Sequence, residues 1–152
     1  MDPITQQTVL AAAGAGGEDK VYVDDVFSTY LYDGNGSTQT ITNGIDLAGE
    51  GGLIWTKWRS GGAYSVESHA LLDTERGFTK VLRSDTTQAS SNVSSYFTAN
   101  SDGYEITTSS SLVNHSSGGK YASWTFRKAP GFFDVVTFTG SGSGTKTVSH
   151  SL

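Results

Sequence analysis

From residue 20 onward, the chain alternates short runs of apolar and β-branched side chains with glycine-rich and serine-rich turns. Residues 26–32 and 38–42 are two such runs, and the tight-turn sequence of residues 33–36 joins them. This pattern is typical of strands connected by short turns, and it has no helical period. We expect further strands at residues 21–23, 53–59, 69–73, 79–83, 95–98, 104–107, 121–127, 132–138 and 145–152.

About ten short strands, with a turn signal roughly every 8–15 residues, predict an all-β fold. The architecture that fits best is an antiparallel β-sandwich of the jelly-roll or concanavalin-like type, spanning residues 18–152. Leu152 falls inside a strand pattern, with neither a closing turn nor a polar tail. We therefore expect this domain to continue in a longer native chain.

The strand expected at residues 53–59 carries large apolar groups on both faces, with Trp55 on one face and Ile54 and Trp58 on the other. This predicts an inner strand that is covered on both sides. Because the chain has few aliphatic residues, we expect Trp55 and Trp124 to belong to the core.

The first 17 residues lack the strand-like pattern of the rest of the chain. Asp2 can cap a helix, Pro3 suits the first helical position, and residues 5–13 tolerate a helix. The glycines among residues 14–17 end any such helix and loosen the chain. We expect residues 1–17 to form a short helical or extended anchor with a Gly-rich linker, which docks either on its own domain or on a partner.

Composition and charge narrow the classes of function. The 152 residues are the size of a single domain. The net charge of −5 and the scattered Lys and Arg residues give no basic stripe, so we expect no nucleic-acid partner. Without cysteine, the chain can form neither disulfides nor thiolate metal sites. No apolar run suits a membrane helix, so no membrane insertion is expected, and the N-terminus does not read as a signal peptide.

The reactive side chains include one cluster that could carry chemistry. His69, Asp73 and Glu75 share a strand face, and a histidine with two carboxylates can bind a metal ion or act in acid–base chemistry. The same spacing arises from an alternating strand that runs into a turn, where Glu75 can pair with Arg76. We favour this structural interpretation and expect no enzymatic activity, no metal site and no cofactor.

Aromatic side chains could instead form a platform for sugars, because aromatic rings suit the apolar faces of sugar rings. Trp58 and Tyr64 are the candidates for such a platform. Trp58 lies on the face opposite Trp55 and next to Arg59. It can therefore be either a core residue or an exposed one.

Four segments together resemble a domain of virion structural proteins from marine tailed phages. They are residues 23–32, 42–55, 73–77 and 124–136. The resemblance covers roughly residues 21–152 and implies a concanavalin-type sandwich that is one piece of a longer tail or tail-fibre protein. It implies no catalytic residues.

The resemblance also gives the N-terminal anchor a meaning. It implies that residues 1–17 attach the chain to the virion tail, with Pro3, Ile4, Val9 and Leu10 as the docking side chains. It further implies a place in the virion tail, adaptor-type or nozzle-type tail proteins as partners, a homotrimer, and a role in virus assembly and host attachment that includes a possible host surface glycan.

Three hypotheses for the function follow. The first is a virion structural protein, the N-terminal tail-attachment module of a tail fibre or tail-associated protein. The second is a carbohydrate-binding module that uses Trp58 or Tyr64. The third is a glycan hydrolase, for which Asp73 and Glu75 are the only pair of carboxylates worth testing.

Overall fold

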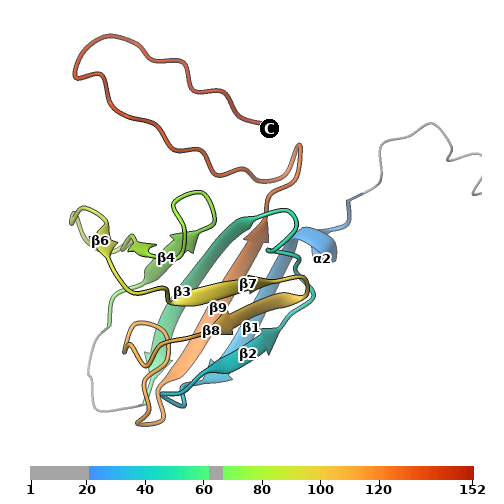
Figure 1. The fold of residues 1–152 in the computed structure, drawn as a ribbon, viewed down its shortest axis with the longest axis vertical. Helices are drawn as coiled ribbons and strands as arrows, with labels where there is room; N and C mark the ends of the chain where they lie inside the picture. The colour runs from blue at the N-terminus through green and yellow to red at the C-terminus, as the bar shows by residue number, and fades with distance from the viewer. Residues whose placement is uncertain (1–20, 62–66) are drawn as a thin grey trace, which may run out of the picture.

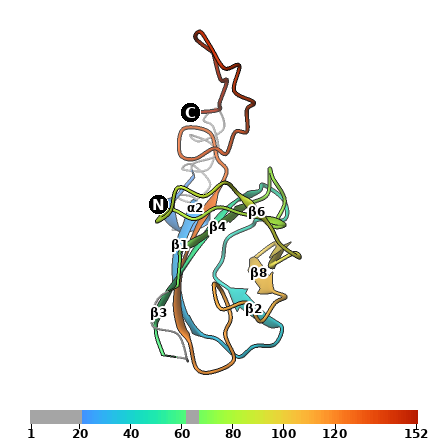
Figure 2. The ribbon, with the colours of Figure 1, turned by 90° about the vertical axis from the view of Figure 1, so that its left-hand side faces the viewer.

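Two antiparallel sheets face each other in the computed structural model, which describes residues 21–61 and 67–152 (Figure 1). The four-stranded sheet has the order β1 (Phe27–Asp33), β9 (Lys120–Arg127), β3 (Gly52–Ser60) and β4 (Ala70–Asp73). The three-stranded sheet has the order β2 (Gln39–Thr42), β8 (Gly103–Ile106) and β7 (Phe97–Asn100). Figure 2 shows the sheets as two layers, so the predicted all-β antiparallel sandwich is confirmed.

Two smaller elements complete the described part. The strands β5 (Lys80–Val81) and β6 (Ser91–Asn92) pair with each other, and an isolated bridge between Leu71 and Leu82 joins β4 to the chain just after β5. A single helical turn, α2 (Val23–Val26), precedes β1. The anchor expected at residues 1–17 lies outside the described residues.

The core fills the space between the layers and takes side chains from both sheets. Along β3, the inward residues Gly52, Ile54 and Thr56 are buried, as the alternation of a strand requires. The larger buried side chains of the core are Tyr32, Ile41, Ile45, Leu47, Ile54, Leu72, Phe97, Tyr104, Ile106, Val113 and Tyr121.

Hydrogen bonds from buried tyrosines tie the layers and loops together. The Tyr104 hydroxyl on β8 donates to Oγ of Ser123 on β9 at 2.7 Å, which links the two sheets inside the core. The Tyr32 hydroxyl donates to the Val113 carbonyl at 2.7 Å. Burial raises the pKa of both hydroxyls, so both stay protonated donors at neutral pH.

Among residues 21–61 and 67–152, one side of the four-stranded sheet is covered by the other layer and the opposite side is not, which corrects two expectations. β3 lies between β9 and β4 within its sheet, but only one of its faces meets the other layer. Trp55 and Trp124 are half-buried on the opposite face and do not belong to the core. The reason is register: both side chains point away from the three-stranded sheet.

Three of the expected strands are wrong. Residues 21–23 lead into α2, and residues 132–138 and 145–152 form no regular strand. The sequence of these segments suits a strand, but a strand also needs a neighbour to bond with, and no sheet of the described residues includes them. The C-terminal segment instead loops out beyond one end of the sandwich (Figures 1 and 2).

Candidate functional site

The uncovered side of the four-stranded sheet is the most distinctive surface among the described residues, and we call it the outer face. Pairing sets its rows, because residues opposite each other on antiparallel strands share a face. Trp124 on β9 lies opposite Trp55 on β3, which in turn lies opposite Leu71 on β4. The outer-face residues include Phe27, Thr29, Leu31, Leu53, Trp55, Lys57, His69, Leu71, Asp73, Ala122, Trp124 and Phe126.

Two tryptophans form the centre of the outer face. The ring centroids of Trp55 and Trp124 lie 5.4 Å apart at an interplanar angle of 53°. This spacing is that of a favourable aromatic pair. The pair leaves part of each indole open to solvent, since both side chains are only half-buried.

His69 joins this pair at the start of β4. The indole Nε1–H of Trp55 donates to Nδ1 of His69 at 3.0 Å, and Nζ of Lys57 lies 2.8 Å from Nε2 of the same ring. A neutral imidazole has one acceptor nitrogen, so His69 accepts from one of these two donors at a time. An imidazolium ring has no acceptor nitrogen, so it could accept from neither donor.

The surroundings of His69 also favour its neutral form. Burial, followed by the charge of Lys57, lowers the pKa of His69 from its ordinary value, and the more distant Asp85 opposes them. His69 is therefore neutral at pH 7. The site presents N–H donors beside an aromatic surface. Asp73 shares this face because it lies opposite Leu53, and its carboxylate is buried against Arg76.

Apolar side chains surround the tryptophan pair. Leu31 on β1 is 60% exposed, and Phe126 packs against Phe27 and Phe133 with ring centroids 4.9 Å and 5.2 Å away. A half-exposed face that is rich in apolar and aromatic side chains is typical of a surface that binds another molecule. It suits a protein surface or the apolar face of a sugar ring.

Of the two residues expected to form a sugar platform, the structure describes Trp58, and it does not lie on this face. Trp58 points to the inner side of β3, packs against the core, and donates from Nε1 to the Gly61 carbonyl at 3.1 Å. Tyr64 lies outside the described residues. The four expected docking residues also lie outside them: Pro3, Ile4, Val9 and Leu10.

The structure gives the three members of the His69 cluster separate partners. Asp73 is buried and accepts from the guanidinium and backbone N–H of Arg76, while Glu75 pairs with Lys128 at 2.6 Å. His69 contacts Trp55 and Lys57 instead, as described above. Within residues 21–61 and 67–152, no group of three His, Asp or Glu side chains is arranged to hold a metal ion.

The sequence carried a partial signal for the tryptophan site. Alternation places Trp55 and Lys57 on one face of their strand, which the printed sequence shows directly. The partners Trp124 and His69 come from β9 and from the start of β4, so only the register of the sheet reveals them. In the part of the chain that the structure describes, no helix has the length and apolar character needed to cross a membrane.

Comparison with known proteins places this architecture in a family. Neither a curated protein nor a solved structure matches the chain. A family described as a domain of unknown function, DUF7483, matches residues 23–152, from α2 through the C-terminal loop. The match spans most of the chain, including every strand of the sandwich. The chain belongs to the DUF7483 family.

Proposed function

We propose that this chain is a virion structural protein of a tailed phage and acts as a contact module in a tail fibre or another tail-associated protein. The observation that carries the proposal is the outer face, where a sheet of the sandwich leaves a row of apolar and aromatic side chains half exposed. The resemblance of residues 23–32, 42–55, 73–77 and 124–136 to marine phage virion proteins suggests the kind of assembly in which this face is used.

The state of the acidic groups supports binding rather than catalysis. A glycan hydrolase needs two carboxyl groups free to face one substrate bond. Asp73 is buried against Arg76, and Glu75 is held by Lys128. Neither carboxylate is available for proton transfer without breaking an ion pair.

The proposed partners are neighbouring tail proteins of the adaptor or nozzle type, and the proposed assembly is a homotrimer, as in fibres. Residues 1–17 supply the attachment segment in this proposal. Sedimentation equilibrium of the purified chain tests the oligomer directly, with three times the monomer mass as the expected result and a monomer as the contrary one.

The place in the virion is tested on purified phage particles from the source. Quantitative peptide mass spectrometry should find this chain at a low and fixed copy number, relative to the major capsid protein. Gold-labelled antibodies against the chain should then mark the tail in electron micrographs. A chain found in the culture fluid and missing from the particles would overturn the proposal.

The outer face can be tested in the same particles. Leu31→Glu places a charge in the exposed apolar row and should lower the amount of chain incorporated at least several-fold. Gln88→Glu adds the same charge on an exposed loop between β5 and β6 and should leave incorporation unchanged. Equal incorporation of both variants would remove the outer face as the contact surface.

Carbohydrate binding is the second candidate, and the Trp55–Trp124 pair with its neighbouring N–H donors favours it. In this version the sugar stacks on Trp124 and not on Trp58, which lies on the inner side of its strand. Calorimetric titration with neutral and acidic oligosaccharides should show weak binding that Trp124→Ala abolishes and Trp58→Phe retains. No heat with any sugar would exclude this candidate.

A further inference from the structure

The C-terminal segment of the chain repeats the sequence of the first two strands. Residues 133–152 align with residues 27–45 when one extra residue, Gly144, is left unpaired. Similar side chains occupy four aligned positions: Tyr32 and Phe138, Ile41 and Val148, Thr42 and Ser149, and Ile45 and Leu152. Identical residues occupy six more: Phe27 and Phe133, Gly34 and Gly140, Gly36 and Gly142, Ser37 and Ser143, Thr38 and Thr145, and Thr40 and Thr147.

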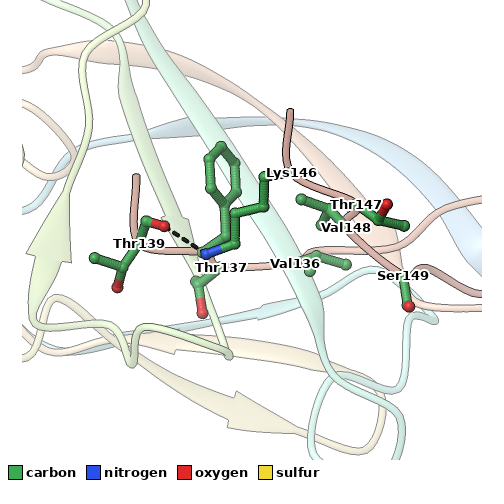
Figure 3. Close-up of a pocket in the computed structure, with 8 residues that line it drawn as sticks. Val136, Thr137, Thr139, Lys146, Thr147, Val148 and Ser149 are labelled. Carbon is green, nitrogen blue, oxygen red and sulfur yellow. Dashed lines mark hydrogen bonds between the residues drawn. The ribbon is translucent and has the colours of Figure 1, made fainter. Parts of the chain in front are cut away.

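The local contacts of the two segments match as well as their sequences. In the first segment, Nε2 of Gln39 donates to the Asp33 carbonyl at 3.3 Å, across the turn between β1 and β2. In the second, Nζ of Lys146 donates to the Thr139 carbonyl at 2.5 Å (Figure 3). Lys146 aligns with Gln39, and Thr139 aligns with Asp33. Different side chains therefore make the same bond at the same place.

The segments also begin in the same way. The backbone N–H of Phe27 donates to the Val23 carbonyl, which closes the helical turn α2. The backbone N–H of Phe133 donates to the Ala129 carbonyl at 3.2 Å, and Ala129 stands at the position of Val23. Each segment thus follows a single closed turn of chain.

The two segments also share the conformation of their turn and a hydrogen bond at their last residue. Gly36 and Gly142 both have a positive φ, of 67° and 77°. At the exit, the backbone N–H of Ile45 donates to the Asn43 side chain at 3.2 Å. The backbone N–H of Leu152 donates to the ring of His150, the residue aligned with Asn43, at 3.1 Å.

The segments differ in what covers them. Tyr32 and Ile45 are 7% and 0% exposed, because β8, β9 and their neighbours pack over them. The aligned Phe138 and Leu152 are 65% and 61% exposed. Positions that belong to a core in the first segment face solvent in the second. Apolar side chains at such positions gain stability only when other strands cover them. The second segment therefore has the side chains of a core without the strands that would bury them.

A hollow lies between the two halves of the C-terminal segment. Residues 136–139 and 146–149 line a hollow of about 490 Å³ (Figure 3). In the first segment, the side chains of the three-stranded and four-stranded sheets fill the corresponding space. The hollow lies at the place that core side chains fill in the aligned first segment.

We infer that residues 133–152 are the first two strands of a second sandwich of the same fold, and that their covering strands, equivalent to β3, β8 and β9, follow in the same chain. In the first sandwich, residues 46–127 supply those strands and come directly after β2. The repeat, in the same order, places the second set directly after Leu152. Another copy of the chain is a poor source, because its own β8 and β9 are already paired with its β2 and β1.

The test is an extended chain, and it stands apart from the proposed virion role because it uses purified protein alone. The extension adds a second copy of residues 46–127 directly after Leu152, which takes the position of Ile45. Hydrogen exchange at residues 135–138 and 146–149 should slow by about 100-fold or more relative to the 152-residue chain. The added copy should be protected like residues 46–127 of the first sandwich.

A matched control is the same extended chain with Phe138→Asp and Val148→Asp. These charges fall on the two aligned core positions, so protection of the second sandwich should be lost while the first sandwich keeps its own. Free exchange of both residues 135–149 and the added copy in the unsubstituted extended chain would overturn the inference.

The 152-residue chain separates the two possible sources of the covering strands. Its sedimentation at increasing concentration should not depend on Phe138, even if it associates through another surface. Self-association that Phe138→Asp abolishes would show that a second copy covers the segment, and the assignment to the same chain would be wrong.

Discussion

Asn114 shows at the scale of one residue how a polar side chain can hold a loop in place. It is fully buried in the loop between β8 and β9, and it donates to the carbonyls of Ser37 and Thr108 at 2.7 Å and 2.9 Å. Its carbonyl oxygen accepts from the backbone N–H of Asn35 and from the Gln39 side chain at 2.9 Å and 2.7 Å. All of its hydrogen-bonding capacity is used, so it fixes this loop to the turn after β1.

Asn114→Ala should lower the free energy of unfolding by about 2–4 kcal/mol, because it removes four hydrogen bonds that a fully buried side chain makes. Asn92→Ala is the control, since Asn92 is an exposed residue of β6 that accepts from Lys80. It should cost no more than about 0.5 kcal/mol. Urea unfolding followed by tryptophan fluorescence measures both. Equal losses would show that burial of the bonds is unimportant.

His69 should make stability depend on pH. Its pKa in the folded state is lowered from the ordinary 6.5, so the unfolded chain binds this proton more readily. The stabilisation is therefore complete above about pH 6.5 and decreases as the pH falls through the lowered pKa. Thermal unfolding between about pH 7 and pH 5 should show a steeper loss for the wild type than for His69→Gln. Parallel curves would contradict the lowered pKa.

The tryptophan site could be predicted from the sequence only in part. Alternation correctly put Ile54 and Trp55 on opposite faces of their strand, but the expectation that both faces are covered was wrong. Trp55 and Trp124 were expected in the core because the chain has few aliphatic residues to fill it. Their pairing depends on a register between strands that are far apart in the sequence.

Among the elements, the pairing of β2 with β8 depends on one glycine. Gly103 opens β8 with a φ of 151°, and a Cβ atom built there would lie 2.0 Å from the Ile41 carbonyl oxygen. Residues other than glycine cannot take this position without moving β2. The three-stranded sheet is therefore closed by a backbone contact and not only by its apolar side chains.

Gly103→Ala should lower the free energy of unfolding by about 2–4 kcal/mol through this clash and the strained φ. Gly140→Ala makes the same chemical change at a glycine with no atom within 4 Å of the added Cβ, and it should change stability by less than about 0.5 kcal/mol. Chemical denaturation of both variants provides the comparison. A Gly103→Ala variant as stable as the wild type would mean that β2 can shift freely.

The elements themselves were mostly predictable, because strand-forming sequence and strand-breaking turns alternate clearly. The strands expected at residues 26–32, 38–42, 53–59 and 121–127 lie within one residue of β1, β2, β3 and β9 at each end. Residues 132–138 have the same character yet form no strand. The local sequence shows whether a segment can form a strand. Whether it finds a neighbouring strand to pair with depends on the whole fold.

At the scale of the whole molecule, the sandwich closes without the C-terminal segment. Every strand of both sheets lies between Phe27 and Arg127. Removal of residues 135–152 keeps Phe133 on Phe126 and keeps the ion pair of Asp134 with Lys128. We expect the truncated chain to unfold within about 2 °C of the full chain in calorimetry. A decrease of about 5 °C or more would make the segment part of the core.

The order of the strands in the sheets could not be predicted from the sequence. β1 pairs with β9, its most distant partner along the chain, and β3 pairs with both β9 and β4. Nothing local in residues 27–33 indicates a neighbour at residues 120–127. Such contacts come from the packing of the complete core, which explains why the class of the fold was predictable and its topology was not.

The pairing of β1 with β9 has a mechanical consequence. Phe27, where β1 begins, lies opposite Phe126, near the end of β9, so the chain enters and leaves the sandwich at the same end. Tension applied to these two points loads the interstrand bonds one after another, as in a zipper, and not all together in shear. A stretched array of such modules would lengthen stepwise at low force.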